Sequence, residues 1–423
     1  MLLISTPMNI INIILAGRFL GKINLISFIS ILIYIFLPSC KNNIKDKSED
    51  ELWEQALMIC NNSIILDSHI DWPERIHDNH KDISKEINEG DFDLVRARKG
   101  GLNAALSVVY IDPSYGVKEG RIMVDSLLQL VTGYSDYYPD QFALARTPDE
   151  IKNNFDNGLF SLPVCLENGA PIGDDLGYLK YLKEQGIVYI TLNHGKVNQI
   201  GDSSYDTIRT WNGLSPFGQE VIIEMNRLGI MIDISHSTDS AVFQALRHSK
   251  APIIASHSSC RHFTPGFERN LSDTLIQAIT DKNGIVMLCF GSRFLDSICM
   301  KNINNLIKLR DSTATTLGSE EGIDFVLKYR ETHNINSNSK IVADHIDHMV
   351  NLVGIDYVGI GSDYDGIGLS QPLDLPDVSS YPVLVFELLN RGYSENDIIK
   401  ILSENFLRVW NDIIEIADSL NNI

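Results

Sequence analysis

Eight short apolar segments, each followed by a stretch with helical periodicity, are the feature that most restricts how this chain can fold. The segments are rich in β-branched residues and have the length of buried strands. They are residues 64–67, 104–111, 160–165, 188–192, 230–234, 252–255, 285–290 and 357–360. Strand and helix alternating eight times predict an α/β fold, a (β/α)8 TIM-type barrel.

The stretches between the strands carry ordinary helix signals, with Ser or Asp at their starts and Gly at their ends. Examples are SPFGQEVIIEMNRLG at residues 215–229 and LSDTLIQAITDKNG at residues 271–284. An open doubly wound sheet is the alternative, but such a sheet usually has a glycine-rich phosphate loop after its first strand. Here the first strand runs into DSHIDWP at residues 67–73, which favours the barrel.

Two regions extend the basic pattern. The long polar connection at residues 294–353, after the seventh strand, is predicted to contain an insertion with a helix near residues 323–332, followed by a regular helix at residues 341–352. After the eighth strand, residues 378–390 and a segment opened by Ser394 predict extra C-terminal helices. We therefore predict one barrel domain over residues 53–423.

The N-terminal region has a different composition. Residues 1–39 include Arg18 and Lys22 but no acidic residue, and they end in an apolar run, as secretory signals do. The sequence LPSC, with a small residue before Cys40, resembles the cleavage box of bacterial lipoproteins. Residues 1–39 are predicted to be a signal peptide, Cys40 the lipidated residue and residues 40–52 a polar tether, with an uncleaved anchor as the alternative. We expect a lipid-anchored protein of the bacterial cell envelope, periplasmic or surface-exposed.

Charge and cysteine content exclude some classes of protein. The formal net charge of −20 provides no basic surface for nucleic acid. No CxxC pair is present, which argues against a thiolate zinc site. The cysteines beyond Cys40 are odd in number, so they do not form a complete disulfide framework, although one or two bridges stay open. They are Cys60, Cys165, Cys260, Cys289 and Cys299.

Polar side chains follow the carboxyl ends of most of the predicted strands. They are His69 and Asp71 after the first strand, Glu167 after the third, His194 after the fourth, His236 after the fifth, His257 after the sixth and Asp363 after the eighth. In a barrel these ends converge on the face that carries the active site. The other histidines follow no such pattern and are predicted to be structural: His77, His80, His248, His262, His333, His345 and His348.

These residue types indicate a metal centre. His69 and Asp71 are two positions apart, so their side chains point to the same side of a strand and can hold one cation. Imidazole and carboxylate ligands without thiolate suit zinc or a similar divalent metal. His236 and His257 could hold a second ion, with Glu167 as a bridge. Two such metals can generate a hydroxide nucleophile at neutral pH.

Taken in order, the motifs resemble those of the membrane (renal-type) dipeptidases, dinuclear zinc peptidases of the amidohydrolase-like barrel group. The matching pieces extend over most of the chain after residue 60. They are DSHIDWP, GGLNAALSVVY, LEN, TLNH, DISHST, SHSS followed by ERNLSD, and GIGSDYDGI.

The resemblance implies a zinc-dependent dipeptidase that cuts dipeptides, including substrates with a D-residue at the C-terminal position, with a metal-bridging hydroxide as nucleophile. It implies a homodimer as well. It assigns His69 and Asp71 to one zinc, His236 and His257 to the other, Glu167 to the bridge, His194 to the substrate carbonyl and its oxyanion, Arg269 to substrate contact and Asp363 to proton relay.

Two departures from the family pattern lie near the expected substrate pocket. Cys289 stands in MLCFGS where such enzymes often have Asn, and the loop SCRHFTPGFERN differs from that of the mammalian enzymes. Two other functions stay open. One is a metal hydrolase acting on a lactone, cyclic amide or phosphoester, against which Arg269 argues. The other is a non-enzymatic lipoprotein that binds metal or peptide, against which Asp363 argues because a binder needs no proton relay.

Overall fold

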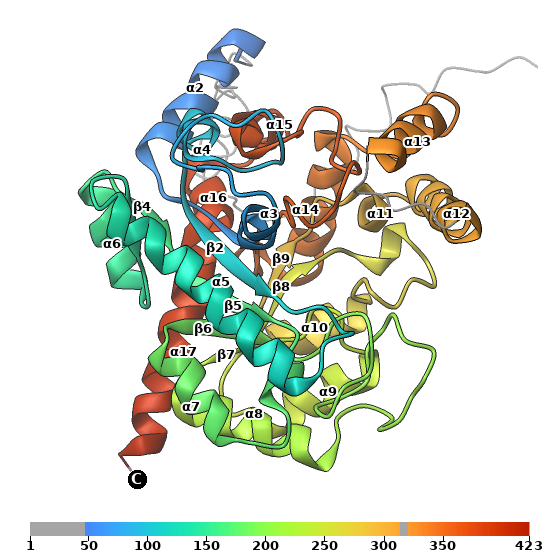
Figure 1. The fold of residues 1–423 in the computed structure, drawn as a ribbon. Coiled ribbons are helices and arrows are strands. Elements are labelled where there is room, and N and C mark those ends of the chain that lie inside the picture. Colours follow the sequence, from blue (N-terminus) through green and yellow to red (C-terminus); the bar gives the residue numbers. More distant parts are fainter. Residues whose placement is uncertain (1–46, 314–319, 423) are drawn as a thin grey trace, which may run out of the picture. The chain divides into compact units, whose positions relative to one another are not determined.

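The computed structural model describes residues 47–313 and 320–422. Two compact units divide the chain after Ser48, and the second unit, Glu49–Ile423, contains the barrel (Figure 1). The predicted signal peptide and the predicted lipidation site at Cys40 lie outside the described residues. Within the described ranges, no helix is both long and apolar enough to cross a bilayer.

Eight parallel strands form the barrel, and each overlaps one of the eight predicted segments. They are β1 (Ile65–Ile70), β2 (Leu102–Tyr110), β5 (Val164–Glu167), β6 (Ile187–Thr191), β7 (Met231–Asp233), β8 (Ile253–Ser258), β9 (Ile285–Leu288) and β10 (Val358–Ile360). Each of these strands pairs in parallel with the next one named, from β1 through to β10. The predicted fold class is confirmed.

The third predicted segment is split by a proline. Pro163 separates β4 (Phe160–Leu162) from β5, and β4 pairs with β2 and with the short strand β3 (Phe142–Leu144). Proline has no N–H to give to a ladder, but its carbonyl accepts a 2.7 Å hydrogen bond from the Ser107 N–H. The barrel strand that carries Glu167 therefore begins only at Val164.

The barrel closes where the first and last strands end. The Asp363 N–H donates to the His69 carbonyl at 3.0 Å, and the Asp71 N–H donates to the Tyr364 carbonyl at 2.9 Å. Ile70 and Tyr364 form a parallel bridge at the same level. This closure brings residues from opposite ends of the domain together at one rim of the barrel.

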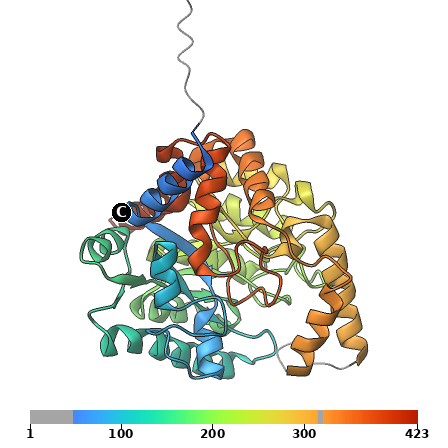
Figure 2. The same cartoon turned by 90° about the horizontal axis from the view of Figure 1, so that it is seen from above.

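Helices surround the strands (Figures 1 and 2). They are α2 (Glu49–Asn62), α3 (Trp72–Asp78), α4 (Leu94–Gly100), α5 (Val117–Tyr137), α6 (Pro148–Asp156), α7 (Gly177–Glu184), α8 (Pro216–Leu228), α9 (Asp239–His248), α10 (Asp273–Thr280), α11 (Ser292–Leu295), α12 (Ser297–Thr313), α13 (Glu320–Arg330), α14 (Ser339–Val353), α15 (Tyr381–Asn390), α16 (Glu395–Ile399) and α17 (Asn405–Asn421). α2 begins at Glu49, within the segment predicted to be a tether.

The sequence signals explain the bounds of several helices. Ser215 caps α8 by accepting a hydrogen bond from the Gly218 N–H, and Gly229 ends this helix in the left-handed conformation. Ser394 opens α16 with a capping box that it shares with Asp397, as predicted. These local signals fix where the chain enters and leaves each helix, and so where the loops of the site begin.

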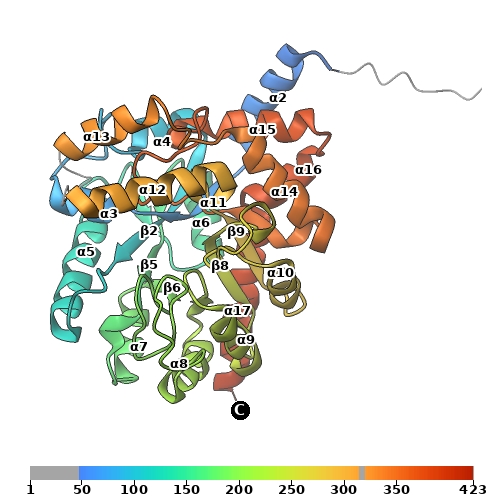
Figure 3. The ribbon, with the colours of Figure 1, turned by 90° about the vertical axis from the view of Figure 1, so that its right-hand side faces the viewer.

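The connection after β9 contains more structure than the sequence predicts. α13 overlaps the predicted helix, and α12 precedes it as an additional helix. We call the described residues 296–313 and 320–338 the insertion. Figures 1 and 3 both show α12 and α13 side by side at the edge of the barrel. Apolar residues of α12, of α13 and of the segment after α13 form a hydrophobic cluster that is separate from the two that fill the barrel: Cys299, Ile303, Leu306, Val326 and Ile335.

Candidate metal centre and active site

The strand-end residues converge on one cavity of about 780 Å³. Five of them line it: Asp71, Glu167, His194, His236 and Asp363. His69 and His257 lie behind this surface, at 0% and 1% exposure. The convergence expected from eight separate strands is therefore present in the structure.

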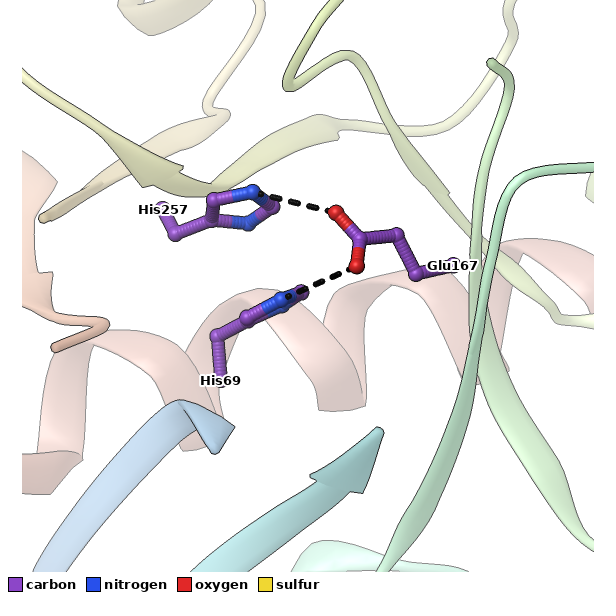
Figure 4. A group of neighbouring side chains, drawn as sticks. All are labelled: His69, Glu167 and His257. Carbon is purple, nitrogen blue, oxygen red and sulfur yellow. Dashed lines mark ion pairs between the residues drawn. The ribbon is translucent and has the colours of Figure 1, made fainter. Parts of the chain in front are cut away.

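Glu167 lies at the centre of this group. Its Oε2 faces His69 Nε2 at 3.6 Å. Its Oε1 lies 3.0 Å from His236 Nε2 and 3.3 Å from His257 Nε2. Figure 4 shows the carboxylate between His69 and His257, with one oxygen directed to each imidazole. One carboxylate thus presents its two oxygens to two different sets of nitrogens.

The hydrogen bonds of His69 fix which ring nitrogen is free. The Tyr189 hydroxyl donates to the Ser68 carbonyl at 3.0 Å, so it accepts from His69 Nδ1 at 2.6 Å. His69 Nε2 then carries a lone pair, and this buried atom has no hydrogen-bond partner. It faces Asp71 Oδ2 at 3.7 Å and Asp363 Oδ1 at 4.0 Å, distances that leave room for an ion.

His257 is oriented in the same manner through a serine. The Ser256 hydroxyl donates to Asp233 Oδ2 at 2.6 Å, so it accepts from His257 Nδ1 at 2.8 Å. Asp233 also accepts from the Thr191 hydroxyl at 2.6 Å, and all of these groups are buried. Such outer partners hold a ligating imidazole in one tautomer and orientation, leaving Nε2 of His257 directed at Glu167.

Two residues of the site have an unusual backbone conformation. His236 has a φ of 70° and Asp363 a φ of 66°, in the left-handed region that non-glycine residues rarely adopt. Strain of this kind persists where the surrounding structure over-determines it, and it concentrates at functional sites. Both residues line the cavity three positions after the ends of β7 and β10.

Negative charge is concentrated in the site. Burial, followed by the charge of Glu167, raises the pKa of Asp71 well above its usual value. Burial and the same carboxylate raise the pKa of Asp363 to about 6. Burial acts to raise the pKa of Glu167 as well, but His69 and His194 hold it well below its ordinary value. Buried like charges of this kind are relieved either by protonation or by a cation bound among them.

The residues present fit a bridged pair of divalent metal ions. His69, Asp71 and Asp363 can converge on one ion, and Glu167 and His257 reach the same region. The group on the other side consists of Glu167, His194 and His236, so it includes the histidine that the resemblance assigns to the substrate. Neutral imidazole nitrogens and carboxylate oxygens are the ligands that zinc and related metals take. The unpartnered His69 Nε2 is the atom that such an ion would satisfy.

His194 lies at the wall of the cavity. Its Nε2 is 3.9 Å from Glu167 Oε1, and its side chain is 25% exposed. Its Nδ1 lies 3.4 Å from the Tyr110 hydroxyl. Burial lowers the pKa of His194, so the ring is neutral at neutral pH. A neutral imidazole here can donate one hydrogen bond to a substrate.

Arg269 lies deeper than the resemblance implies. It is 3% exposed and does not line the cavity. Its guanidinium donates to the Ser258 hydroxyl at 3.1 Å and to the His257 carbonyl at 2.9 Å, while its Nε has no partner. Arg293, which the sequence did not single out, lines the cavity instead. It donates to Asn304 of α12 at 2.9 Å.

Cys289, which stands where the family often has Asn, contacts a residue of the site directly. The Cys289 thiol donates to Asp363 Oδ2 at 3.5 Å. Burial raises the pKa of this thiol, so it stays protonated. None of the five cysteines in the described residues forms a disulfide.

His345 supports the loop that departs from the family pattern. Its Nδ1 accepts from the Cys260 N–H at 3.1 Å, and its Nε2 bonds to the Leu295 carbonyl at 2.9 Å. The residue is fully buried in α14. This agrees with the structural role predicted for it.

Stability is expected to fall on acidification through His345. Burial, with the positive charges of nearby histidines, lowers its pKa from 6.5 to about 4. The stabilisation is therefore complete above about pH 6.5 and is lost as the pH falls toward about 4, up to roughly 3 kcal/mol. Urea unfolding at a series of pH values should show a flatter pH dependence for His345→Gln than for the parent chain. Equal slopes would contradict this assignment.

Sequence reasoning missed the residues that orient the site. Tyr189, Asp233 and Ser256 lie inside β6, β7 and β8. The first two have apolar neighbours on both sides, and Ser256 follows an alanine. The sequence indicates only that a polar residue lies within an apolar strand. It does not indicate which imidazole that residue contacts. Arg293 had no signal beyond its place after the seventh strand.

The model of the membrane dipeptidase family, peptidase family M19, matches residues 53–423. The chain belongs to this family. It is a metal-dependent dipeptidase, in agreement with the site described above. The matched residues include every candidate ligand and the whole of the barrel.

Curated relatives and solved structures show the same likeness. The dipeptidase is 31% identical to dipeptidase aclJ of Aspergillus oryzae, over 78% of this chain and 72% of that one. It is 28% identical to dipeptidase 3 of Mus musculus, over 88% and 69%. The structure of the probable dipeptidase PvdM from Pseudomonas aeruginosa superposes with a TM-score of 0.75 at 26% identity, covering 87% and 99%.

A second solved structure shares the fold at lower identity. It is a metallo peptidase from Rhodobacter sphaeroides, liganded with a phosphinate mimic of the dipeptide L-Ala-D-Ala. Its TM-score is 0.70 at 22% identity, and the alignment covers 83% of this chain and all of that one.

Proposed function

We propose that the dipeptidase holds two zinc ions and hydrolyses dipeptides whose C-terminal residue is of either L or D configuration. The observation that carries the proposal is the position of Glu167, whose two oxygens face His69 on one side and His236 and His257 on the other. The imidazole and carboxylate donors favour zinc. The dipeptide mimic with a D-residue bound to the Rhodobacter sphaeroides enzyme supports the substrate class.

The protein's own residues supply the remaining chemistry. Bound at this site, the two ions would polarise the scissile carbonyl and lower the pKa of a water molecule. Asp363, directed into the cavity, is placed to take the proton from the attacking water and pass it to the leaving amine. His194 donates a hydrogen bond to the oxygen on which negative charge develops. Arg269 is buried behind the lining of the cavity, so it acts on the free carboxylate of the substrate through its positive charge alone.

The test is hydrolysis of a dipeptide panel by the purified chain. We expect cleavage of Ala-Ala with an L- or a D-residue at the C-terminus, loss of activity on incubation with a chelator, and recovery on addition of Zn²⁺. Metal analysis should give two ions per chain. A simple lactone and a phosphoester serve as controls. Activity that survives complete metal removal, or hydrolysis of the controls alone, would refute the proposal.

We also propose that the dipeptidase is a lipoprotein, anchored through Cys40 to a membrane of the bacterial cell envelope. The basic residues, the apolar run and the LPSC sequence before the barrel support this. The full chain expressed in a bacterium should appear in the membrane fraction, and Cys40→Ala should impair its processing. A chain that carries no lipid, or a variant processed as the parent is, would disprove lipidation.

The family resemblance further supports a homodimer. Light scattering of the purified barrel domain should then give twice the mass of one chain. A monomer at micromolar concentration would count against this part of the proposal.

A further inference from the structure

The cavity extends well beyond the candidate metal centre. Its volume of about 780 Å³ lies toward the upper end of the range for pockets that enclose drug-sized ligands. A dipeptide of two small residues would fill only a part of it. The space that remains lies against the insertion, which provides a wall of aliphatic side chains: Ile303, Leu306, Ile307, Val326 and Ile335.

This wall is held in place by its own packing. Four of its five residues belong to the hydrophobic cluster that α12 and α13 share, and their exposure is 8% or less. The Tyr329 hydroxyl of α13 donates to the Asn302 carbonyl of α12 at 3.1 Å. The Asn302 amide donates to the Asn334 carbonyl at 2.8 Å. The apolar surface is therefore preformed, so a ligand need not order it on binding.

The charges of the cavity are divided between its two ends. The acidic residues of the lining lie toward the metal end: Asp71, Glu74, Glu167, Asp363 and Asp365. The positive charges of the lining lie toward the insertion: Arg310 belongs to α12, and Arg293 donates to Asn304 of α12. The ammonium and carbonyl groups of a dipeptide have their partners at the metal end. The part that reaches the insertion is a side chain, and an aliphatic wall favours an apolar one.

We infer that the insertion forms the side-chain subsite of this dipeptidase and selects dipeptides that carry one large apolar side chain, such as that of leucine or phenylalanine. The inference rests on the proposed function and specifies its substrate class. Under this inference α12 and α13 bind a substrate side chain, although their described residues contribute no metal ligand.

Steady-state kinetics on two dipeptide series test this inference. In each series one position is alanine and the other is Gly, Leu, Phe, Glu or Lys. With the zinc-loaded chain, we expect kcat/KM for Leu or Phe to exceed that for Gly by at least about tenfold in one series. The series that shows the effect identifies which residue of the dipeptide, N-terminal or C-terminal, has its side chain against the insertion.

Two isoleucines of α12 provide a matched pair of variants. Ile307 lines the cavity, whereas Ile298 is 60% exposed and does not. Ile307→Ser should reduce the Leu-to-Gly ratio of kcat/KM by about fivefold, while Ile298→Ser should leave this ratio unchanged. Leu306→Ala is a second variant with the same expected direction. Thermal unfolding of each variant checks that α12 and α13 remain folded.

The outcomes separate this inference from the proposed function. Hydrolysis of no dipeptide at all would contradict the proposed function and this inference with it. Hydrolysis with no preference for size, or with a preference for Glu, would overturn the inference alone. An unchanged ratio in both Ile307→Ser and Leu306→Ala would also overturn it.

Discussion

Glu167→Gln is expected to leave the chain unable to hold two metal ions and to reduce dipeptide hydrolysis by more than about 100-fold. Loss of residues that merely orient a ligand costs about 10–100-fold, and a bridging ligand should cost more. Glutamine has the shape of glutamate but no charge. It has a single side-chain oxygen, whereas Glu167 directs one oxygen at His69 and the other at His236 and His257. Metal content and kcat/KM measured on the same preparation check this.

The control for this variant is Glu184→Gln. Glu184 is exposed at the end of α7 and makes a long ion pair of 3.8 Å with Lys180. Its replacement should change neither metal content nor activity. If Glu167→Gln retains two ions per chain and the activity of the parent, Glu167 is not the bridge.

Asp363→Asn is expected to lower kcat by about 10²- to 10⁴-fold, the range that general acid–base catalysis contributes. The asparagine keeps the shape of the side chain, and its backbone can still donate to the His69 carbonyl across the barrel closure. It cannot take up a proton from water. The loss should therefore appear in kcat, with a smaller change in KM. Single-turnover kinetics separate the chemical step from product release.

Asp356→Asn is the matched control, because Asp356 is exposed and pairs with Lys400 at 2.7 Å. Metal analysis of Asp363→Asn is essential, since Asp363 Oδ1 lies 4.0 Å from His69 Nε2. A variant that keeps both ions and hydrolyses dipeptides at the parent rate would show that Asp363 moves no proton. One that loses an ion would place Asp363 among the ligands.

The barrel could be predicted because its strands are continuous apolar runs between capped helices. The strand-end position of each polar residue then specified the face of the barrel on which it lies. This is why the amino-acid sequence alone was enough to group His69, Glu167, His194, His236, His257 and Asp363. None of these arguments needs knowledge of how one side chain contacts another.

What could not be predicted depends on contacts between distant elements. The tautomer of His69 is set by Tyr189, which is separated from it by 120 residues. Histidine and aspartate adopt the left-handed conformation more often than most residues but still rarely, so residue type alone did not predict it at His236 and Asp363. α12 was missed because its apolar residues are spaced for a small cluster with α13 within a polar stretch. The deep position of Arg269 likewise follows from its bonds to Ser258 and His257.

The closure of the barrel has a consequence for when this protein becomes active. His69 and Asp71 leave the ribosome almost 300 residues before Asp363, and the hydrogen bonds that join their strands can form only after β10 has docked. An incomplete nascent chain therefore cannot present the full set of groups, and the site is complete only once β10 has docked. The same seam joins residues almost 300 positions apart, and contacts of such high sequence separation form slowly, so its docking is a candidate for the slow step of folding.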